Sequence, residues 1–507
     1  MGQTANKVIK NTGYLYAKLG ITMFISLLIT RLILNSLGAS DYGIFNIIGG
    51  VIAMLGFLNA AMATATQRYM NYCEGNGEKE MQKIIFNTGI VLHFAIAFIA
   101  SIALLVIGYI FFNGVLNIPQ DRVMAAKIVY GSLILSTFFT ITSVPYDAAV
   151  NAHENMKYYA IVGLIESLLK LGVAIIVVFT SADKLIVYGI LMAFIPFITR
   201  TILRIYCHRH YEECTVSLRE YFKKSTAKEM ASFAGWNFLI TTAHMICFYG
   251  KGIILNHFFG PLLNAAHGIT NDLNGKFLTF STHMQKAINP VIAKSEGAGN
   301  RKKMLEASMI GNKWLFFVFA IVIIPAFIES KLLLQLWLKN PPAWTLIFVR
   351  IQLLQTLISL TTATFHTSIL AEGNIALYSK IASSLNITAI AAIWIAFSLD
   401  TSPISLYVIS FIINGVIFSI TQIYFVKRNC GLSIVAFLKK VAFPCFIVFA
   451  IPFFITTIVH MNMEERLSRL LVATAVSTFT FVFSLLIFGL TKKERGILST
   501  LVKKKLA

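Results

Sequence analysis

Residues 84–112, IIFNTGIVLHFAIAFIASIALLVIGYIFF, form an apolar stretch that contains no Asp, Glu, Lys or Arg. A helix of this length can cross the hydrocarbon core of a bilayer, which takes about 20 residues. The rest of the 507-residue chain has the same character, with 57% hydrophobic residues, 13% charged residues and a mean hydropathy of +0.74. Soluble domains carry roughly 25% charged residues. The sequence therefore predicts a polytopic membrane protein that has no room for a soluble catalytic domain.

The same apolar pattern recurs along the chain and predicts an all-α protein with about 14 transmembrane helices. Only short polar segments separate these helices. We expect the spans at residues 12–36, 43–66, 84–112, 124–147, 158–181, 185–203, 231–258, 262–285, 308–330, 344–369, 377–398, 403–426, 441–460 and 470–490.

The chain carries 43 Lys and Arg against 22 Asp and Glu, which gives a formal net charge of +21. In a soluble protein this charge would indicate nucleic-acid binding, but here most of the basic residues fall in alternate loops between spans. The positive-inside rule then predicts that both termini are cytoplasmic. We expect anionic lipid headgroups, and no nucleic acid, as the partner of this charge.

The two halves of the chain repeat each other. Glu74-Gly75-Asn76-Gly77 corresponds to Glu296-Gly297-Ala298-Gly299, and Pro119 to Pro341, both at a shift of 222 residues. The shift is 219 further along the chain, where Tyr188 meets Tyr407. The two Glu-Gly-x-Gly segments predict tight turns, because neither has the Lys or the strand context of a phosphate-binding loop.

This repeat predicts two parallel six-helix bundles, of the kind that rock against each other in many transporters. We expect the first bundle at residues 1–206, a cytoplasmic linker at 207–230, the second bundle at 231–428, and two further helices with a basic tail at 429–507.

Ionisable residues inside the predicted spans are candidates for function, because each costs at least about 2.5 kcal/mol on insertion scales. The cations are Lys18, Arg31, Lys127, Lys170, Arg200, Lys251, Lys276, Lys313 and Arg350, and the acids considered are Asp147, Glu166 and Asp272. A positive interior suits an anion, and the planar fork of Arg matches phosphate oxygens. Lys18, Arg200 and Lys313 lie near inner boundaries, where long side chains snorkel to the headgroups.

We assign substrate binding to six of these cations, with snorkelling as the alternative for Lys127 and Arg350: Arg31, Lys170, Lys251, Lys276, Arg350 and Lys127. Glu166 and Lys170 are four residues apart, as are Asp272 and Lys276, so each acid and base shares one helix face. Such a pair either neutralises itself or releases its cation to the substrate. The candidates for coupling transport to H⁺ or Na⁺ are Glu166, Asp272, His244 and His267.

No nucleophile with a base and no metal-ligand spacing is evident, and the six cysteines show no disulfide framework. We therefore expect neither an enzyme nor a cofactor.

Three segments resemble a known family: Leu37-Gly38-Ala39-Ser40-Asp41-Tyr42-Gly43-Ile44, Pro145-Tyr146 with Ala152-x-Glu154, and Leu336-Trp337-Leu338 with Pro341. Together with the 14-span layout they are similar to the bacterial O-antigen and capsular polysaccharide flippases of the multidrug/oligosaccharidyl-lipid/polysaccharide (MOP) exporter superfamily. The resemblance implies a MATE-like inner-membrane protein that moves an undecaprenyl-diphosphate-linked repeat unit to the periplasmic leaflet. Its substrate headgroup would enter a cationic cleft between the bundles, and the polysaccharide polymerase machinery would be a partner.

Three alternatives remain at this stage. A cation-coupled multidrug exporter of the same superfamily would need carboxylates, but the first two predicted spans hold no Asp or Glu. A lipid II flippase of peptidoglycan synthesis has the same kind of anionic substrate. A membrane polysaccharide polymerase would need a sizeable outer loop, whereas the longest outer loop expected here is short, near residues 331–343.

Overall fold

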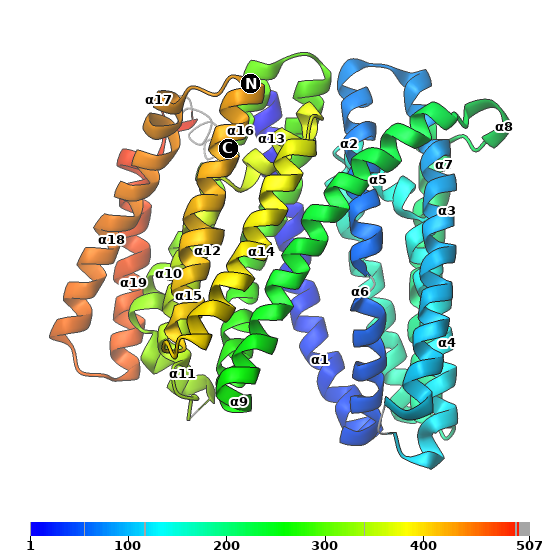
Figure 1. Cartoon of the computed structure of the whole chain (residues 1–507), viewed down its shortest axis with the longest axis horizontal. Helices are drawn as coiled ribbons and strands as arrows, with labels where there is room; N and C mark the ends of the chain where they lie inside the picture. Colours follow the sequence, from blue (N-terminus) through cyan, green and yellow to red (C-terminus); the bar gives the residue numbers. More distant parts are fainter. Residues whose placement is uncertain (1, 55, 116–117, 339, 492–493, 496–507) are drawn as a thin grey trace, which may run out of the picture. The chain divides into compact units, whose positions relative to one another are not determined.

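The computed structural model describes residues 2–54, 56–115, 118–338, 340–491 and 494–495, which form helices and connecting turns without a β-strand. The chain divides into two compact units (Figure 1). We call residues 10–241 the N-terminal unit, and residues 1–9 with 242–507 the C-terminal unit. The all-α architecture predicted from the sequence is confirmed.

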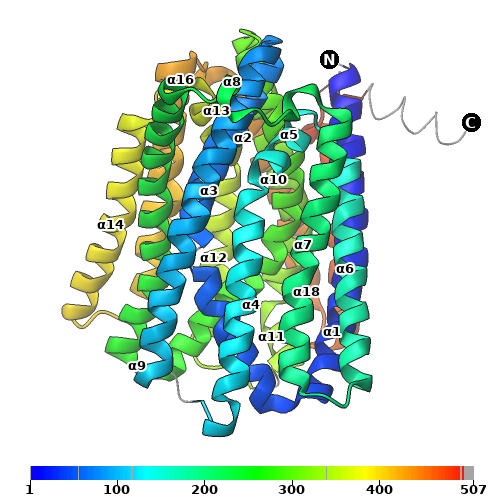
Figure 2. The same cartoon turned by 90° about the vertical axis from the view of Figure 1, so that its right-hand side faces the viewer.

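The N-terminal unit holds most of α1, the helices α2 to α8, and the first part of α9. Within it, α4 lies beside both α3 and α7 (Figure 2). The elements are α1 (Gly2–Met54), α2 (Gly56–Asn76), α3 (Lys79–Ile110), η1 (Phe111–Val115), η2 (Gln120–Arg122), α4 (Val123–Thr142), α5 (Val144–Ala152), α6 (Met156–Phe179), α7 (Lys184–His210), η3 (Glu212–Cys214), α8 (Leu218–Tyr221) and α9 (Lys224–Gly297).

The C-terminal unit holds the remainder of α9 and all later helices. Its last two long helices, α18 and α19, run side by side and pack against α10 (Figure 1). The elements are α10 (Arg301–Ile328), α11 (Ser330–Leu338), α12 (Thr345–Leu360), α13 (Ala363–Glu372), α14 (Ala376–Ser398), α15 (Ile404–Ser410), η4 (Phe411–Ile417), α16 (Phe418–Cys430), α17 (Ile434–Phe437), η5 (Leu438–Ala442), α18 (Phe443–Asn462), α19 (Leu467–Ser484) and η6 (Leu485–Gly489).

Eleven helices in the described residues are long and apolar enough to cross a membrane, and the bent pair α12 and α13 makes a twelfth span. The chain is thus a multi-pass membrane protein. The predicted spans 43–66 and 262–285 are helical but are not among these twelve. The first straddles the junction of α1 and α2, and the second lies in the second part of α9. Both carry polar side chains that are buried within their own unit, such as Thr66 and Thr270, and this lowers their apolar character.

The internal repeat is also visible in the backbone. Gly38 interrupts α1 at φ 77° and ψ 167°, and Gly260, 222 residues later, interrupts α9 at φ 79° and ψ −176°. This region of backbone space is essentially restricted to glycine. Gly77 and Gly299, at the same shift, have φ of 77° and 69°. The predicted tight turns at the two Glu-Gly-x-Gly segments are therefore confirmed, whereas the bundle boundaries at 206, 230 and 428 stay a prediction.

A second pair of related breaks divides one span in each unit. Ser143 separates α4 from α5, and Thr361 and Thr362, at a shift of 219 from Thr142 and Ser143, separate α12 from α13. In the first break Arg204 donates hydrogen bonds to the hydroxyls of Thr142 and Ser143, at 2.8 and 3.0 Å. Side chains thus satisfy polar groups that a continuous helix would not expose.

The second break is held by Asn312 of α10. Its Oδ1 accepts hydrogen bonds from the backbone N–H and the hydroxyl of Thr364, at 2.7 and 2.8 Å, in a fully buried position. The first turn of α13 is therefore capped by a neighbouring helix, which fixes the bend of 40° between α12 and α13.

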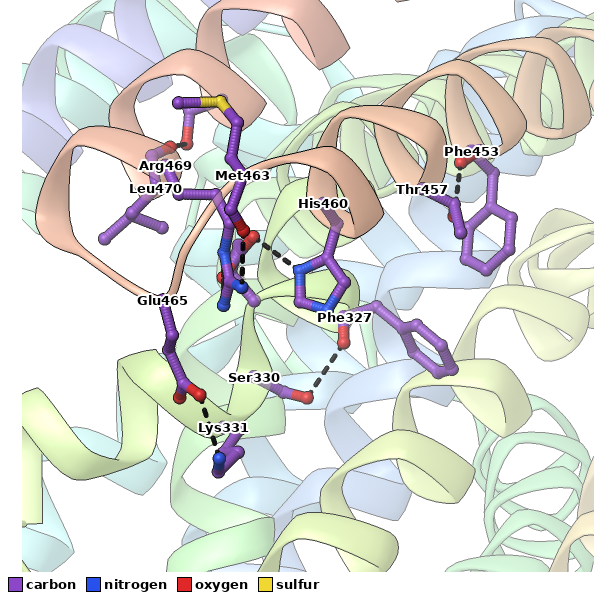
Figure 3. A network of polar contacts seen from close by, with 12 residues as sticks. Phe327, Ser330, Lys331, Phe453, Thr457, His460, Met463, Glu465, Arg469 and Leu470 are labelled. Carbon is purple, nitrogen blue, oxygen red and sulfur yellow. Dashed lines mark hydrogen bonds and ion pairs between the residues drawn. The ribbon is translucent and has the colours of Figure 1, made fainter.

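Buried polar contacts join α18 and α19 to the rest of the C-terminal unit at one end. Glu329, which follows α10, is 0% exposed; its carboxylate accepts from Arg469 Nη2 at 2.9 Å and lies 2.8 Å from Nδ1 of His460. Arg469 also donates to the carbonyl of Met463 at 3.3 Å. Figure 3 shows His460 and Arg469 converging from two helices on this carboxylate.

A buried lysine joins α10 to the other end of the same helices. Lys313 is 2% exposed, and its Nζ donates to the carbonyl of Gly489 at 3.0 Å and to Glu494 at 2.7 Å. The expectation that Lys313 snorkels to headgroups was therefore wrong, because an anionic partner from the chain's own C-terminal part reaches it.

Candidate substrate-binding site

The cations of the N-terminal unit mostly meet anions or aromatic rings inside that unit. Lys170 donates to Glu166 at 2.7 Å, so the predicted self-neutralising pair on α6 forms. Lys18 does not extend freely; its Nζ lies 4.7 Å from the ring centre of Tyr159, in space left by Gly163.

Arg200 and Lys127 follow the same trend. Arg200 pairs with Asp147 at 2.9 Å, which places an anion where snorkelling was expected. Lys127 is exposed, with its Nζ 5.9 Å from the ring of Phe112. Arg31 is exposed on α1, and no contact is given for it among the described residues.

An unpredicted ion-pair cluster lies in the N-terminal unit where α1 passes η2 and α7. Arg122 donates from Nε to Asp41 at 2.9 Å and from Nη1 to Asp183 at 2.7 Å. Burial by itself raises the pKa of Asp183, but hydrogen bonds from the Ile186 N–H and from Arg122 outweigh it, so the pKa lies below its ordinary value. Asp41 belongs to the segment that carries the family resemblance, and the structure gives it this partner.

The C-terminal unit treats its cations differently. Lys251 of α9 donates to Oδ1 of Asn414 at 3.2 Å, and Asn414 in turn donates from Nδ2 to Oδ1 of Asn386 at 3.2 Å. Asn414 lies in η4, a π-helical turn, and such turns occur frequently at functional sites. The partners of Lys251 are thus neutral amides, which orient the ammonium group without cancelling its charge.

Histidines gather around Lys251. His244, Cys247 and Lys251 are spaced three and four residues apart, so they share one face of α9. His244 interacts electrostatically with Lys251 and with His366 of α13, and His267 interacts with Lys251. None of the contacts described for these histidines is with Asp or Glu.

The two other histidines each bind a tyrosine. Nδ1 of His267 lies 2.8 Å from the Tyr407 hydroxyl, and its Nε2 lies 3.0 Å from the amide nitrogen of Asn271. Nδ1 of His366 lies 3.0 Å from the Tyr378 hydroxyl. His267 is thus engaged at both ring nitrogens, whereas His366 is engaged at one in the described part of the chain.

The second predicted acid and base pair does not form. Asp272 and Lys276 are both exposed, and Lys276 places its Nζ 5.0 Å from the ring centre of Trp337. The correct spacing on a helix permits an ion pair but does not enforce one, and the aromatic ring of α11 competes successfully.

Arg350 also lacks an acidic partner in its described contacts. It donates from Nε to the hydroxyl of Ser330 at 2.9 Å and lies over the ring of Phe327 at 5.6 Å. Lys251, Lys276 and Arg350 thus retain their charge, and we regard their surroundings as the part of the molecule best suited to an anion. The described residues hold no cluster of His, Cys, Asp and Glu able to bind a metal ion.

Sequence reasoning missed Glu329, Asn386, Asn414 and His366. Glu329 is the penultimate residue of a predicted span, and the other three are polar residues inside predicted spans. Their position was therefore a usable signal for all four. Which of them meet one another depends on helices far apart in the sequence.

No protein-family model matches the sequence, and no curated protein matches it. Solved structures do match. An outward-facing multidrug resistance MATE family transporter of the MOP superfamily is 13% identical, with a TM-score of 0.67 over 83% of this chain and 96% of its own. The chain has the MATE transporter fold.

Two further structures give the same result. A MATE transporter from Vibrio cholerae is 14% identical with a TM-score of 0.66, over 86% of this chain and 99% of its own. A MOP superfamily transporter from Pyrococcus furiosus, described as having a binding pocket of reversed polarity that suggests a different function, is 13% identical with a TM-score of 0.67, over 85% of this chain and 96% of its own. At this identity the MATE likeness establishes the fold and leaves the substrate to be inferred from the residues of this chain.

Proposed function

We propose that the protein is an inner-membrane flippase for a polyprenyl-diphosphate-linked oligosaccharide, a repeat unit of a surface polysaccharide. The MATE transporter fold supports a membrane transporter working by alternating access. The family resemblance of the segments around Gly38, Pro145 and Trp337 supports the polysaccharide branch of the superfamily.

One observation carries the choice of an anionic substrate. Lys251 lies within a span and is held by the amide of Asn414, so no carboxylate in its described contacts cancels its charge. Burying an ammonium group without a counter-ion is costly, and a substrate anion removes that cost. A drug exporter for organic cations would bind its substrate poorly beside this lysine.

The test begins with depletion of the protein in its own host. Mass spectrometry of the lipid extract should show accumulation of a polyprenyl-diphosphate oligosaccharide, with loss of one surface polymer. The mass distinguishes a polysaccharide repeat unit from lipid II. Absence of any accumulation, with surface sugars intact, would refute the flippase and leave export of organic cations as the function to test.

Complementation then assigns the lysine. Lys251→Met should fail to restore the polymer, and Lys251→Arg should restore it at least in part, because Arg keeps the charge. The matched control is Glu166→Gln with Lys170→Met, which removes a paired acid and base and leaves the net charge unchanged. Restoration by Lys251→Met at normal protein levels would contradict the role of this lysine.

A further inference from the structure

The C-terminal unit concentrates groups that are positive or can become so. Lys251 and His244 lie on one face of α9, and His366 of α13 interacts electrostatically with His244. The other groups that face these three are Cys247, His267, Tyr378 and the amide of Asn414, and none of them is an acid. A group of like charges without a counter-ion destabilises itself, and a bound anion reverses this.

The hydrogen bonds decide which histidine is able to exchange a proton. The Tyr378 hydroxyl accepts from Gln422 at 3.5 Å and has its own proton for Nδ1 of His366; it also serves as acceptor when both ring nitrogens carry protons. His366 is therefore accommodated in both protonation states. His267 receives the amide of Asn271 at Nε2, so protonating it would require that amide to turn.

We propose that Lys251, His244 and His366 form a binding site for a phosphate-type anion, and that the anion binds there together with a proton. The bound anion stabilises the imidazolium form, and the imidazolium stabilises the bound anion, so the two equilibria are linked. Each anion would then carry part of its compensating charge as H⁺. The identification of the anion as the substrate's diphosphate rests on the proposed function; the proton-linked site does not.

The experiment measures binding of inorganic pyrophosphate to the full-length protein in lipid nanodiscs by isothermal titration calorimetry. Measurements at pH 8 and pH 6, in buffers of different ionisation enthalpy, count the protons taken up for each anion bound. Uptake of one proton strengthens binding by up to about tenfold for each pH unit. We expect tighter binding at pH 6 with proton uptake between zero and two.

Variants separate the charge from the proton. His244→Gln with His366→Gln should leave binding at pH 8 nearly unchanged and abolish its strengthening at pH 6. Lys251→Met should weaken binding at both pH values, and Lys251→Arg should preserve it. The control is His257→Gln, a histidine of the same helix that stacks on Trp394 outside this cluster.

Several outcomes overturn the proposal: no pyrophosphate binding by the monodisperse wild-type protein, binding without pH dependence, or a double histidine variant that keeps the full pH dependence. Each variant is compared only where its elution from size exclusion matches the wild type, and the Gln and Arg replacements provide the folded comparison. Proton-linked binding without lipid accumulation in the depleted host would leave this site standing and refute the flippase. Accumulation without proton-linked binding would do the opposite.

Discussion

Replacing Arg469 by Met should release the last two membrane helices from the C-terminal unit. Arg469 and His460 are the described partners of Glu329, which is 0% exposed. Removing one partner of a buried ion pair costs about 3–5 kcal/mol, because the remaining charge stays buried without compensation. Local opening of α18 and α19 should therefore become roughly 100-fold to several thousandfold more frequent, at tenfold for each 1.4 kcal/mol.

The assay uses a buried thiol in the same helix. Cys445 of α18 is free and buried, so a variant that keeps it as the sole cysteine reports opening through its rate of reaction with a maleimide. The rate in Arg469→Met should rise with the opening frequency. Adding Glu329→Leu removes the buried anion as well and should restore slow labelling.

The matched control is Lys331→Met, which breaks the exposed pair of Lys331 and Glu465 at the same end of the helices. Exposed pairs contribute little to stability, so labelling should stay at the wild-type rate. A labelling rate in Arg469→Met equal to wild type, or a double variant no slower than the single one, would show that this ion pair does not hold the helices.

Three further predictions concern the backbone and the ion pairs. Gly38→Ala should destabilise the protein by about 1–3 kcal/mol in thermal unfolding, because φ 77° with ψ 167° excludes a Cβ, whereas Gly131→Ala, which adds a methyl group in open space, should not; equal melting of the two variants would contradict this. Asn312→Ala should cost about 1–3 kcal/mol by leaving the buried N–H at the start of α13 without an acceptor, and an unchanged melting temperature would show that another group replaces it. The pKa of Asp183 is lower in the folded state, so its pair with Arg122 contributes stability above the ordinary carboxyl range and loses it as pH falls below about 4; Asp183→Asn should therefore lower the melting temperature at pH 7 and make it less sensitive to acid than the wild type.

Short-range patterns in the sequence predicted several contacts correctly. The four-residue spacing of Glu166 and Lys170 gave the ion pair that the structure contains, and the Glu-Gly-x-Gly segments gave left-handed turns at Gly77 and Gly299. The same spacing failed for Asp272 and Lys276, because Trp337 of another helix offers Lys276 its ring. Local geometry permits a contact, and the surrounding helices decide whether it forms.

Composition and periodicity by themselves determined that this chain is an all-α membrane protein with an internal repeat, because apolar length and the positions of glycine act within one helix. Only the tertiary structure decided which charges are cancelled. Lys313 meets Glu494, and Arg200 meets Asp147, while Lys251 meets only neutral partners in its described contacts. Whether a buried charge is compensated depends on a few ångströms between residues that lie tens to hundreds of positions apart in the chain, and no local pattern records that distance.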